Sequence, residues 1–329
     1  MHTIGVIGAG AWGTALAQAL RRGGREVALW ARERDVLEDI RSHHENRTFL
    51  PGVALDPAIR VEGDPAAVAQ AVDALLLVVP AQHLRATAQR LAPSMQADLP
   101  LVICAKGIET GSLALMSEVL EETAPGRPAA VLSGPTFARE VALGQPAAVT
   151  LAGRDPVLGE TLAAAVGSRT FRPYLSNDPV GVQIGGAVKN VVAIACGIVA
   201  GRGLGESARA ALITRGLAEI SRLAVAKGGR TDTLMGLAGL GDLTLTCTGA
   251  SSRNYSLGVA LGQGHDKDAV LGKRSSVAEG AFTAAAAAAL ARRLEVDMPI
   301  VQAVDGVLNH DADLAAAIEG LLARPFRSE

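Results

Sequence analysis

The sequence predicts an α/β protein with a parallel-sheet domain over residues 1–178 and an all-helical domain over residues 179–329. Three observations support this fold class. A glycine-rich turn joins a strand to a helix near the N-terminus, and apolar runs then alternate with helix-forming segments as far as residue 175. From Pro179 onward the sequence turns to long runs of Ala, Leu and Glu. A chain of 329 residues is also long for one core, which favours two domains.

The first predicted strand and helix enclose the spacing G-x-G-x-x-G, within TIGVIGAGAWGTALA. Thr3–Ile7 is a short apolar run of β-favouring residues, and Ala11–Arg22 is rich in helix formers. Glu26–Trp30 follows as a second strand. This strand–loop–helix–strand order is that of a Rossmann-type dinucleotide-binding domain, and it argues against an ordinary turn that merely contains glycine.

Each glycine of the loop has a predicted role. Gly8 allows the tight turn, Gly10 lets the backbone approach a pyrophosphate, and Gly13 lets the helix pack closely on the strand. The free amides at the start of the helix and the positive end of its dipole then favour phosphate charge. The sequence therefore predicts that a dinucleotide binds here.

The end of the second strand bears on which dinucleotide binds. The strand ends in ALWARERD, so Arg32 precedes the first acidic residue, Glu33. A guanidinium accepts a 2′-phosphate or stacks on adenine, whereas a carboxylate would repel the phosphate. A solvated helix start is the alternative interpretation of this segment. We expect NADP to be accepted, and NAD remains compatible with the sequence.

Bulk properties limit the partners. The chain has 31 basic and 33 acidic residues, which gives no indication of a nucleic-acid or membrane-surface partner. Its three cysteines stand apart without C-x-x-C spacing, which suits a reducing cytoplasm, and we expect no metal site. No signal peptide is predicted, and the uncharged stretch 191–201 is too short to span a bilayer. We expect a cytoplasmic protein without membrane insertion.

The αβ alternation continues through several apolar runs typical of buried parallel strands. These runs are residues 74–79, 101–104, 129–132, 147–151 and 170–175. The alternation stops at Asp178 and Pro179, which suit the N-cap and the first position of a helix, and we place the domain boundary there. The alanine-rich run 281–294 is predicted to be a helix rather than disorder.

Ligands of open parallel sheets lie beyond the carboxyl ends of the strands. In this chain Lys106 follows one predicted strand end, while Gly134 and Thr136 follow another within SGPTF. A lysine is most often a solvated charge, but this position favours a role in binding.

With these motifs in view, the chain resembles the bacterial NAD(P)-dependent glycerol-3-phosphate dehydrogenase family over nearly its whole length. The strings that carry the resemblance stand in the family's order: IGAGAWGTALA, AKGIE, SGPTFA, GGAVKNV, GLAGLGDL, CTGASSRN and VAEG. The resemblance implies reversible reduction of dihydroxyacetone phosphate to sn-glycerol 3-phosphate with either nicotinamide cofactor. It also implies a catalytic cleft between the two domains and suggests a homodimer. The product of that reaction would supply phospholipid synthesis.

The resemblance names Lys189 as the acid/base of this reaction. Hydride transfer to a ketone needs a proton for the forming alkoxide. A lysine serves near neutral pH where burial or a neighbouring cation lowers its pKa, and Lys106, implied at the substrate, is the candidate neighbour. The alternative is a helix lysine that reaches solvent. Because the surrounding sequence GVQIGGAVKNVVAIACGIVAG is otherwise apolar, an unpaired cation there would be costly.

Asp242, within GLAGLGDL, is implied to accept from the substrate hydroxyl or to orient Lys189, although a helix cap is the alternative. Thr246, four residues on, shares that face if the segment is helical. Hydroxyl, guanidinium and amide donors in SSRN suit a substrate phosphate at the start of a helix, and a simple helix cap is the alternative there. The implied substrate-binding residues are Lys106, Gly134, Thr136, Lys189, Asn190, Asp242, Thr246, Ser252, Arg253 and Asn254. The implied cofactor-binding residues are Gly8, Gly10, Ala11, Trp12, Gly13, Arg32, Lys106, Ala138, Arg253, Val277 and Glu279.

One departure from the family is Ala11, where many relatives carry serine, so that position keeps its backbone contact and loses a hydroxyl. Competing interpretations are a hydroxyacid or ketopantoate-type reductase, a non-catalytic NAD(P)H sensor, and a structural protein with a vestigial cofactor fold. The first class places its lysine and asparagine four residues apart, whereas Lys189 and Asn190 are adjacent here. A sensor would need a docking or DNA-binding segment, and none is evident.

Overall fold

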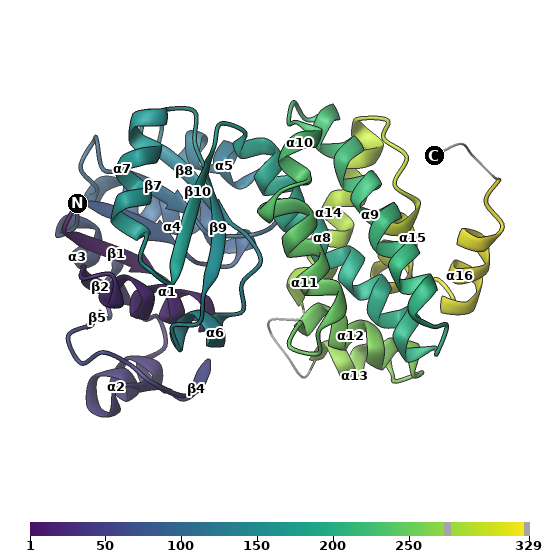
Figure 1. Cartoon of the computed structure of the whole chain (residues 1–329), viewed down its shortest axis with the longest axis horizontal. Coiled ribbons are helices and arrows are strands. Elements are labelled where there is room, and N and C mark those ends of the chain that lie inside the picture. The colour runs from purple at the N-terminus through teal and green to yellow at the C-terminus, as the bar shows by residue number, and fades with distance from the viewer. Residues whose placement is uncertain (273–277, 326–329) are drawn as a thin grey trace. The chain divides into compact units, whose positions relative to one another are not determined.

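The chain folds into two compact units, which are described separately (Figure 1). The computed structural model describes residues 1–272 and 278–325. The first unit comprises Met1–Lys106 and Ala114–Gln183, and the second comprises Gly107–Leu113 together with the chain from Ile184 onward.

A mixed β-sheet forms the centre of the first unit. Within the described residues it has eight strands in the order β10-β9-β8-β7-β6-β1-β2-β5. The strands are β1 (Thr3–Ile7), β2 (Glu26–Trp30), β5 (Arg60–Glu62), β6 (Ala74–Leu77), β7 (Leu101–Ile103), β8 (Ala129–Ser133), β9 (Ala147–Ala152) and β10 (Phe171–Ser176). All seven strands expected from the apolar runs are present, and the strand-order reversal beside β1 is that of doubly wound folds.

Two strands, β9 and β10, run opposite to the other strands of this sheet. β8 and β9 are antiparallel, with Leu132 opposite Leu151, whereas the other neighbouring pairs of this sheet are parallel. The connection between them holds α6 (Ala138–Ala142), a helix of five residues. Such a helix is about 7.5 Å long and does not run back along a strand of about 16 Å, as a parallel crossover requires. The chain therefore returns antiparallel.

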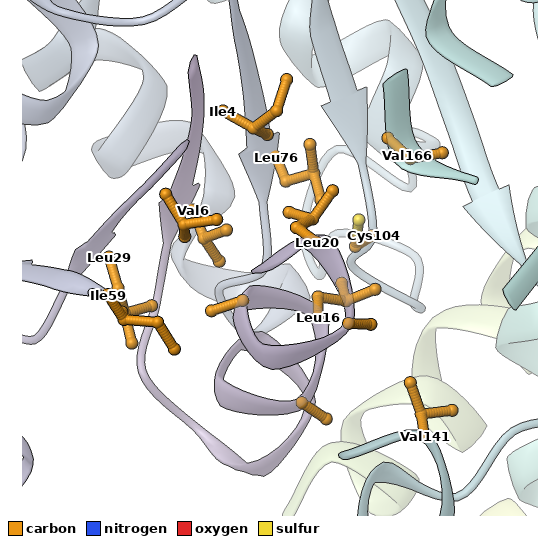
Figure 2. Close-up of a cluster of buried hydrophobic side chains, with 14 of the residues drawn as sticks. Ile4, Val6, Leu16, Leu20, Leu29, Ile59, Leu76, Cys104, Val141 and Val166 are labelled. Carbon is orange, nitrogen blue, oxygen red and sulfur yellow. The ribbon is translucent and has the colours of Figure 1, made fainter. Parts of the chain in front are cut away.

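Buried residues of α1 (Ala11–Arg22), α6 and α7 (Pro156–Val166) share one apolar cluster with side chains from one face of this sheet. Leu16 and Leu20 of α1 pack there against Ile4, Val6 and Leu76 of the strands (Figure 2). The other α-helices described in the unit are α2 (Arg34–His43), α3 (Pro65–Gln70), α4 (Leu84–Leu91) and α5 (Met116–Thr123). The glycine loop thus joins a buried strand to a helix whose inner side is buried in this core.

A hairpin that was not expected from the sequence follows α2. Its strands are β3 (Glu45–Asn46) and β4 (Leu50–Ala54), which pair antiparallel. Both strands are short, and Pro51 and Gly52 interrupt any regular alternation in β4. Strand periodicity is therefore absent from the local sequence.

In the second unit, the described residues from Ile184 onward form helices joined by turns and loops, without a strand. Its α-helices are α8 (Pro179–Gly201, which begins in the first unit), α9 (Glu206–Ala226), α10 (Thr231–Leu234), α11 (Asp242–Thr248), α12 (Arg253–Gly262), α13 (Lys267–Gly272), α14 (Ala278–Arg293), α15 (Pro299–Asn309) and α16 (Leu314–Leu322). A π-helical turn, η3 (Leu237–Gly241), precedes α11. As expected, α8 begins at Pro179, and the Asp178 carboxylate caps it by accepting from the Gly181 amide at 2.8 Å.

Helix α8 is the core of the second unit. It is 23 residues long and, by length and composition alone, could cross a membrane, because it extends the uncharged stretch 191–201 back across Lys189 to Pro179. In the fold, 83% of its most apolar window is buried, as in the central helix of a globular domain.

A short segment, Gly107–Leu113, belongs to the second unit although both its neighbours along the chain belong to the first. The Arg293 guanidinium in α14 donates to the Ser112 carbonyl at 3.2 Å and ties the segment to that unit.

Candidate functional site

The glycine loop between β1 and α1 has the geometry that its spacing predicts. Gly8 has a φ of 120°, a conformation that side-chain-bearing residues rarely adopt. A Cβ on Gly13 would overlap the Gly8 carbonyl oxygen, so this glycine is required for packing of α1 on β1. A Cβ on Gly10 would meet no protein atom within 4 Å. The protein itself therefore leaves room at Gly10, and the loop fits a pyrophosphate held by the amides of α1.

The other predicted cofactor residues of this region lie around the loop. Ala11 and Trp12 open α1, and the Trp12 ring lies 6.4 Å from that of Phe171. Arg32 follows β2 and is exposed, and its guanidinium pairs with the Glu33 carboxylate at 2.6 Å. A 2′-phosphate at Arg32 would therefore compete with this neighbouring carboxylate.

Two neighbouring strand ends bring Lys106, Gly134 and Thr136 together. The Lys106 ammonium after β7 donates to the Gly134 carbonyl after β8 at 3.4 Å, and the Thr136 hydroxyl donates to the same oxygen at 3.4 Å. A Cβ on Gly134 would lie 2.8 Å from the Val149 Cα, and its φ is 154°, so glycine is required at this turn. Ala138, four residues after Gly134, begins α6. A cation and a hydroxyl thus converge at the carboxyl edge of the sheet.

In the second unit, Gly185 before Lys189 controls how closely the π-helical turn approaches α8. A Cβ on Gly185 would lie 2.6 Å from the Ala238 carbonyl oxygen of η3. Lys189 lies one helical turn beyond Gly185, and Asp242 lies four residues beyond Ala238. The glycine therefore allows the contact that presents the Asp242 carboxylate to Lys189. π-Helical turns occur frequently at functional sites.

Lys189, Asp242 and Thr246 form a buried polar cluster. The Lys189 ammonium pairs with the Asp242 carboxylate and donates to the Thr246 hydroxyl at 2.9 Å. The Thr246 hydroxyl in turn donates to the Asp242 backbone carbonyl at 2.6 Å. Lys189 is 7% exposed and Asp242 is fully buried, so the alternative of a lysine reaching solvent is wrong. A carboxylate at this position stabilises the ammonium form of the lysine.

Two buried thiols lie behind this cluster. Cys196 follows Lys189 by two turns of α8, and Cys247 follows Thr246 in α11. A hydrogen bond with Cys196 and burial both raise the pKa of the Cys247 thiol, while the Lys189 charge lowers it. Cys247 therefore stays protonated and packs as a neutral group beneath the ion pair.

The SSRN motif opens α12, as expected. The Ser252 hydroxyl accepts from the Tyr255 amide at 3.2 Å, so this serine caps the helix, and it is 4% exposed. Arg253 and Asn254 are the first two residues of α12, and the arginine is exposed. The Asn254 carboxamide oxygen packs on Gly280 of α14, where a Cβ would lie 2.5 Å away.

Glycines on α8 and α12 let the two helices cross with their backbones in contact. A Cβ on Gly197 of α8 would overlap the Tyr255 carbonyl, and a Cβ on Gly258 of α12 would overlap the Ile194 carbonyl. The same relation holds one turn later for Gly201 and Gly262. This crossing fixes the start of α12 relative to the helix that carries Lys189.

Three further predicted residues are placed only in part. Asn190 follows Lys189 in α8 and is half-buried. Glu279 lies in α14, but its side chain is not among those described, and Val277 lies outside the described residues.

Sequence reasoning missed Asn46 in β3. This residue is fully buried, and its carboxamide nitrogen donates to the Ala9 carbonyl of the glycine loop at 2.8 Å. The local sequence HHENRTF is polar and lacks periodicity, so nothing in it indicates a buried asparagine.

A glycine loop of this geometry in a doubly wound sheet, with a buried lysine–carboxylate pair in a helical unit, defines a two-domain NAD(P)-dependent dehydrogenase as the class of protein. Comparison with known families is more specific. Residues 3–158 match the model of the NAD-dependent glycerol-3-phosphate dehydrogenase N-terminus, and residues 178–319 match that of its C-terminus. The chain belongs to the NAD-dependent glycerol-3-phosphate dehydrogenase family.

The similarity to individual relatives extends along nearly the whole chain. Glycerol-3-phosphate dehydrogenase [NAD(P)+] of Rhodospirillum rubrum is 59% identical over 326 residues, which cover 99% of this chain and 93% of the relative. The crystal structure of glycerol-3-phosphate dehydrogenase from Coxiella burnetii superposes with a TM-score of 0.94 at 39% identity, covering 98% of this chain and 99% of the other. A ketopantoate reductase from Ralstonia eutropha shares the fold alone, with a TM-score of 0.64 at 17% identity over 94% of this chain and 97% of the other.

Proposed function

We propose that the chain interconverts dihydroxyacetone phosphate and sn-glycerol 3-phosphate with NAD or NADP as the cofactor. The observation that carries this function is the buried Lys189 ammonium held by Asp242 and Thr246, in a chain that belongs to this family over both units. The glycine loop fits the cofactor, which supplies or accepts the hydride when bound. A sensor or a vestigial fold would have no use for a buried ion pair, because such pairs are expensive to maintain.

In the proposed mechanism, Lys189 holds the proton that goes to the forming alkoxide oxygen. Asp242 keeps the ammonium charged and oriented, and Thr246 fixes the direction of its second N–H bond. For the reverse reaction the lysine returns as a base after it has given up that proton. Lys106 stabilises the developing negative charge on the substrate oxygen, as cations do in sites of carbonyl reduction.

We assign the substrate phosphate to the start of α12. Arg253 and Asn254 supply charged and amide donors there, and the free backbone amides of a helix N-terminus favour an anion. Ser252 supports this role as the cap that holds the helix start, and its hydroxyl hydrogen remains a possible donor. Asn190, Gly134 and Thr136 complete the substrate-binding set.

The cofactor set of this proposal comprises the glycine loop with Ala11 and Trp12, together with Arg32, Lys106, Ala138, Arg253, Val277 and Glu279. Residues 1–178 are the cofactor domain and residues 179–329 the catalytic domain. We further propose a cytoplasmic homodimer whose product feeds phospholipid synthesis, and light scattering on the purified protein tests the dimer.

The activity is tested by following NADH and NADPH oxidation with dihydroxyacetone phosphate. Unphosphorylated dihydroxyacetone and ketopantoate serve as matched controls, because each lacks the phosphate. We expect turnover with the phosphate ester and kcat/KM lower by about a hundredfold or more without it, since charge-assisted bonds are among the strongest contacts. Comparable rates with dihydroxyacetone would overturn the phosphate assignment.

The role of Lys189 is tested by Lys189→Met, which keeps the apolar stem and removes the charge. We expect kcat to fall by about 10²–10⁴, the usual contribution of a general acid. The dissociation constant for NADPH should stay within about twofold, because the glycine loop is untouched. A near-normal kcat would exclude Lys189 as the proton donor. Lys189→Arg is the companion variant that keeps the charge in a different shape.

A further inference from the structure

Asn46 contacts the cofactor loop although no motif contains it. Its carboxamide nitrogen donates to the Ala9 carbonyl at 2.8 Å and to the Thr14 hydroxyl at 2.8 Å, and its oxygen accepts from the Phe49 amide at 3.0 Å. Thr14 donates to the same Ala9 carbonyl at 3.3 Å. Asn46 and Thr14 are both fully buried.

The orientation of this carboxamide is set by its partners. The Phe49 amide requires an oxygen opposite it, and the Ala9 carbonyl requires a donor. A flipped Asn46 would set its own N–H bonds against the Phe49 N–H and its oxygen against the Ala9 carbonyl oxygen. The hairpin residue therefore presents its N–H bonds to the glycine loop in one arrangement.

This contact controls the direction of the Gly10 amide. The carbonyl of Ala9 and the N–H of Gly10 belong to one planar trans peptide and point in opposite directions. Because Asn46 and Thr14 hold the carbonyl toward the interior of the unit, the N–H must point away from it. That is the side where a Cβ on Gly10 would meet no protein atom within 4 Å.

We propose that Asn46 is a positioning residue that preorganises the Gly10 amide for the cofactor pyrophosphate. It acts through Ala9 and touches neither substrate nor cofactor. Without it, only the longer Thr14 hydrogen bond holds the Ala9 carbonyl, so the Ala9–Gly10 peptide is less constrained and cofactor binding must fix its orientation. The inference rests on the proposed cofactor role of the glycine loop.

The test compares Asn46→Ala with the wild type by quenching of tryptophan fluorescence, with Trp12 beside the loop as the reporter. We expect the dissociation constants for NADPH and for ADP-ribose to rise by about tenfold, the effect of one well-placed hydrogen bond. Adenosine, which lacks the pyrophosphate, should lose less than about twofold. At saturating cofactor, kcat and the KM for dihydroxyacetone phosphate should stay within about twofold.

Two further variants separate positioning from folding. Thr14→Val removes the second donor to Ala9 without changing the side-chain shape and should weaken ADP-ribose binding in the same way, whereas Thr14→Ser restores it. Gln18→Leu is the matched control, because Gln18 accepts from the Asp56 amide at 2.8 Å beyond the other end of the hairpin and lies nine residues from Ala9 along the chain. It should leave ADP-ribose binding unchanged.

A pH series on Asn46→Asp adds a measurement that separates loss of this hydrogen bond from a general loss of packing around the glycine loop. The carboxylate repels the Ala9 carbonyl, but its protonated form donates to it, so the loss of ADP-ribose binding should shrink as the pH is lowered. Equal losses for ADP-ribose and adenosine, or losses with Gln18→Leu, would overturn the positioning role. Failure of the wild type to bind any dinucleotide would instead overturn the proposed function, so the two failures are distinguishable.

Discussion

At the scale of single residues, Glu219 shows how a buried carboxyl group makes stability depend on pH. Its side chain in α9 is 1% exposed and accepts from the Ile300 and Val301 amides at the start of α15, at 2.8 and 3.2 Å. Burial raises the pKa of Glu219 to about 7, against the lowering effects of those two hydrogen bonds and of Arg222. Asp297 also raises it. The neutral acid is therefore favoured in the folded protein.

We predict that Glu219 destabilises the fold as the pH rises from about 4.5 to 7. The folded pKa lies above the ordinary glutamate value of 4.5, so the folded state holds the extra proton in this interval and loses that stabilisation as the pH increases. Glu219→Gln stays neutral and keeps an acceptor for α15. Urea unfolding measures the difference in unfolding free energy between this variant and the wild type. That difference should shift in favour of the variant by roughly 2–3 kcal/mol between pH 5 and pH 8.

The control for this prediction is Glu206→Gln on the same helix, since Glu206 is exposed and pairs with Arg209. Its stability difference from the wild type should not depend on pH by more than about 0.5 kcal/mol. A pH-independent difference for Glu219→Gln would show that Glu219 is ionised in the folded protein throughout.

At the scale of elements, the crossing of α8 and α12 depends on glycines that leave no space for a side chain. We predict that Gly197→Ala lowers the unfolding free energy by about 1–3 kcal/mol or more, because the added methyl overlaps the Tyr255 carbonyl and the helices must separate. The KM for dihydroxyacetone phosphate should also rise, since the displaced helix begins with Arg253 and Asn254. Urea unfolding and steady-state kinetics measure both effects.

The matched control is Gly320→Ala in α16, where a Cβ would meet nothing within 4 Å. Because alanine is the better helix former, that change should be neutral or should stabilise by up to about 1 kcal/mol. A Gly197→Ala protein as stable as the wild type would mean that the two helices can separate without cost.

Other elements of the fold show what the sequence could and could not predict. Local patterns predicted β1, β2 and α1 at their observed ends, because the glycine loop and the strand–helix alternation act over a few residues. The direction of β9 depends instead on the length of α6, and β5 is a three-residue strand with charged ends and no readable pattern. The Lys189–Asp242 pair joins positions 53 residues apart, and residue types alone do not predict that contact. Asn46 was missed for the same reason.

At the scale of the whole molecule, the three cysteines report on the two units separately. All three are free and buried, Cys104 in the first unit and Cys196 and Cys247 in the second. Burial raises the pKa of Cys104, so its reactive thiolate forms only when the surrounding structure opens.

We predict that labelling of the native protein by a thiol reagent is slow at all three positions and complete after denaturation. Saturating NADPH should slow the labelling of Cys104 more than that of Cys196 or Cys247, because most of the proposed cofactor residues lie in the first unit and a ligand protects the structure that it contacts. Mass spectrometry of the labelled peptides measures each rate. Equal protection of the three thiols would mean that the units open together.

Because the segment Gly107–Leu113 belongs to the second unit, the protein cannot be divided cleanly between its two units. A gene fragment that starts at Ile184 would lack a piece of the second unit, including the Ser112 carbonyl that Arg293 binds. A fragment that ends at Gln183 would carry that piece as an exposed insertion without its partner. The two units are therefore not interchangeable modules, and recombination at the apparent boundary would disrupt the second unit while leaving the first with a surplus loop.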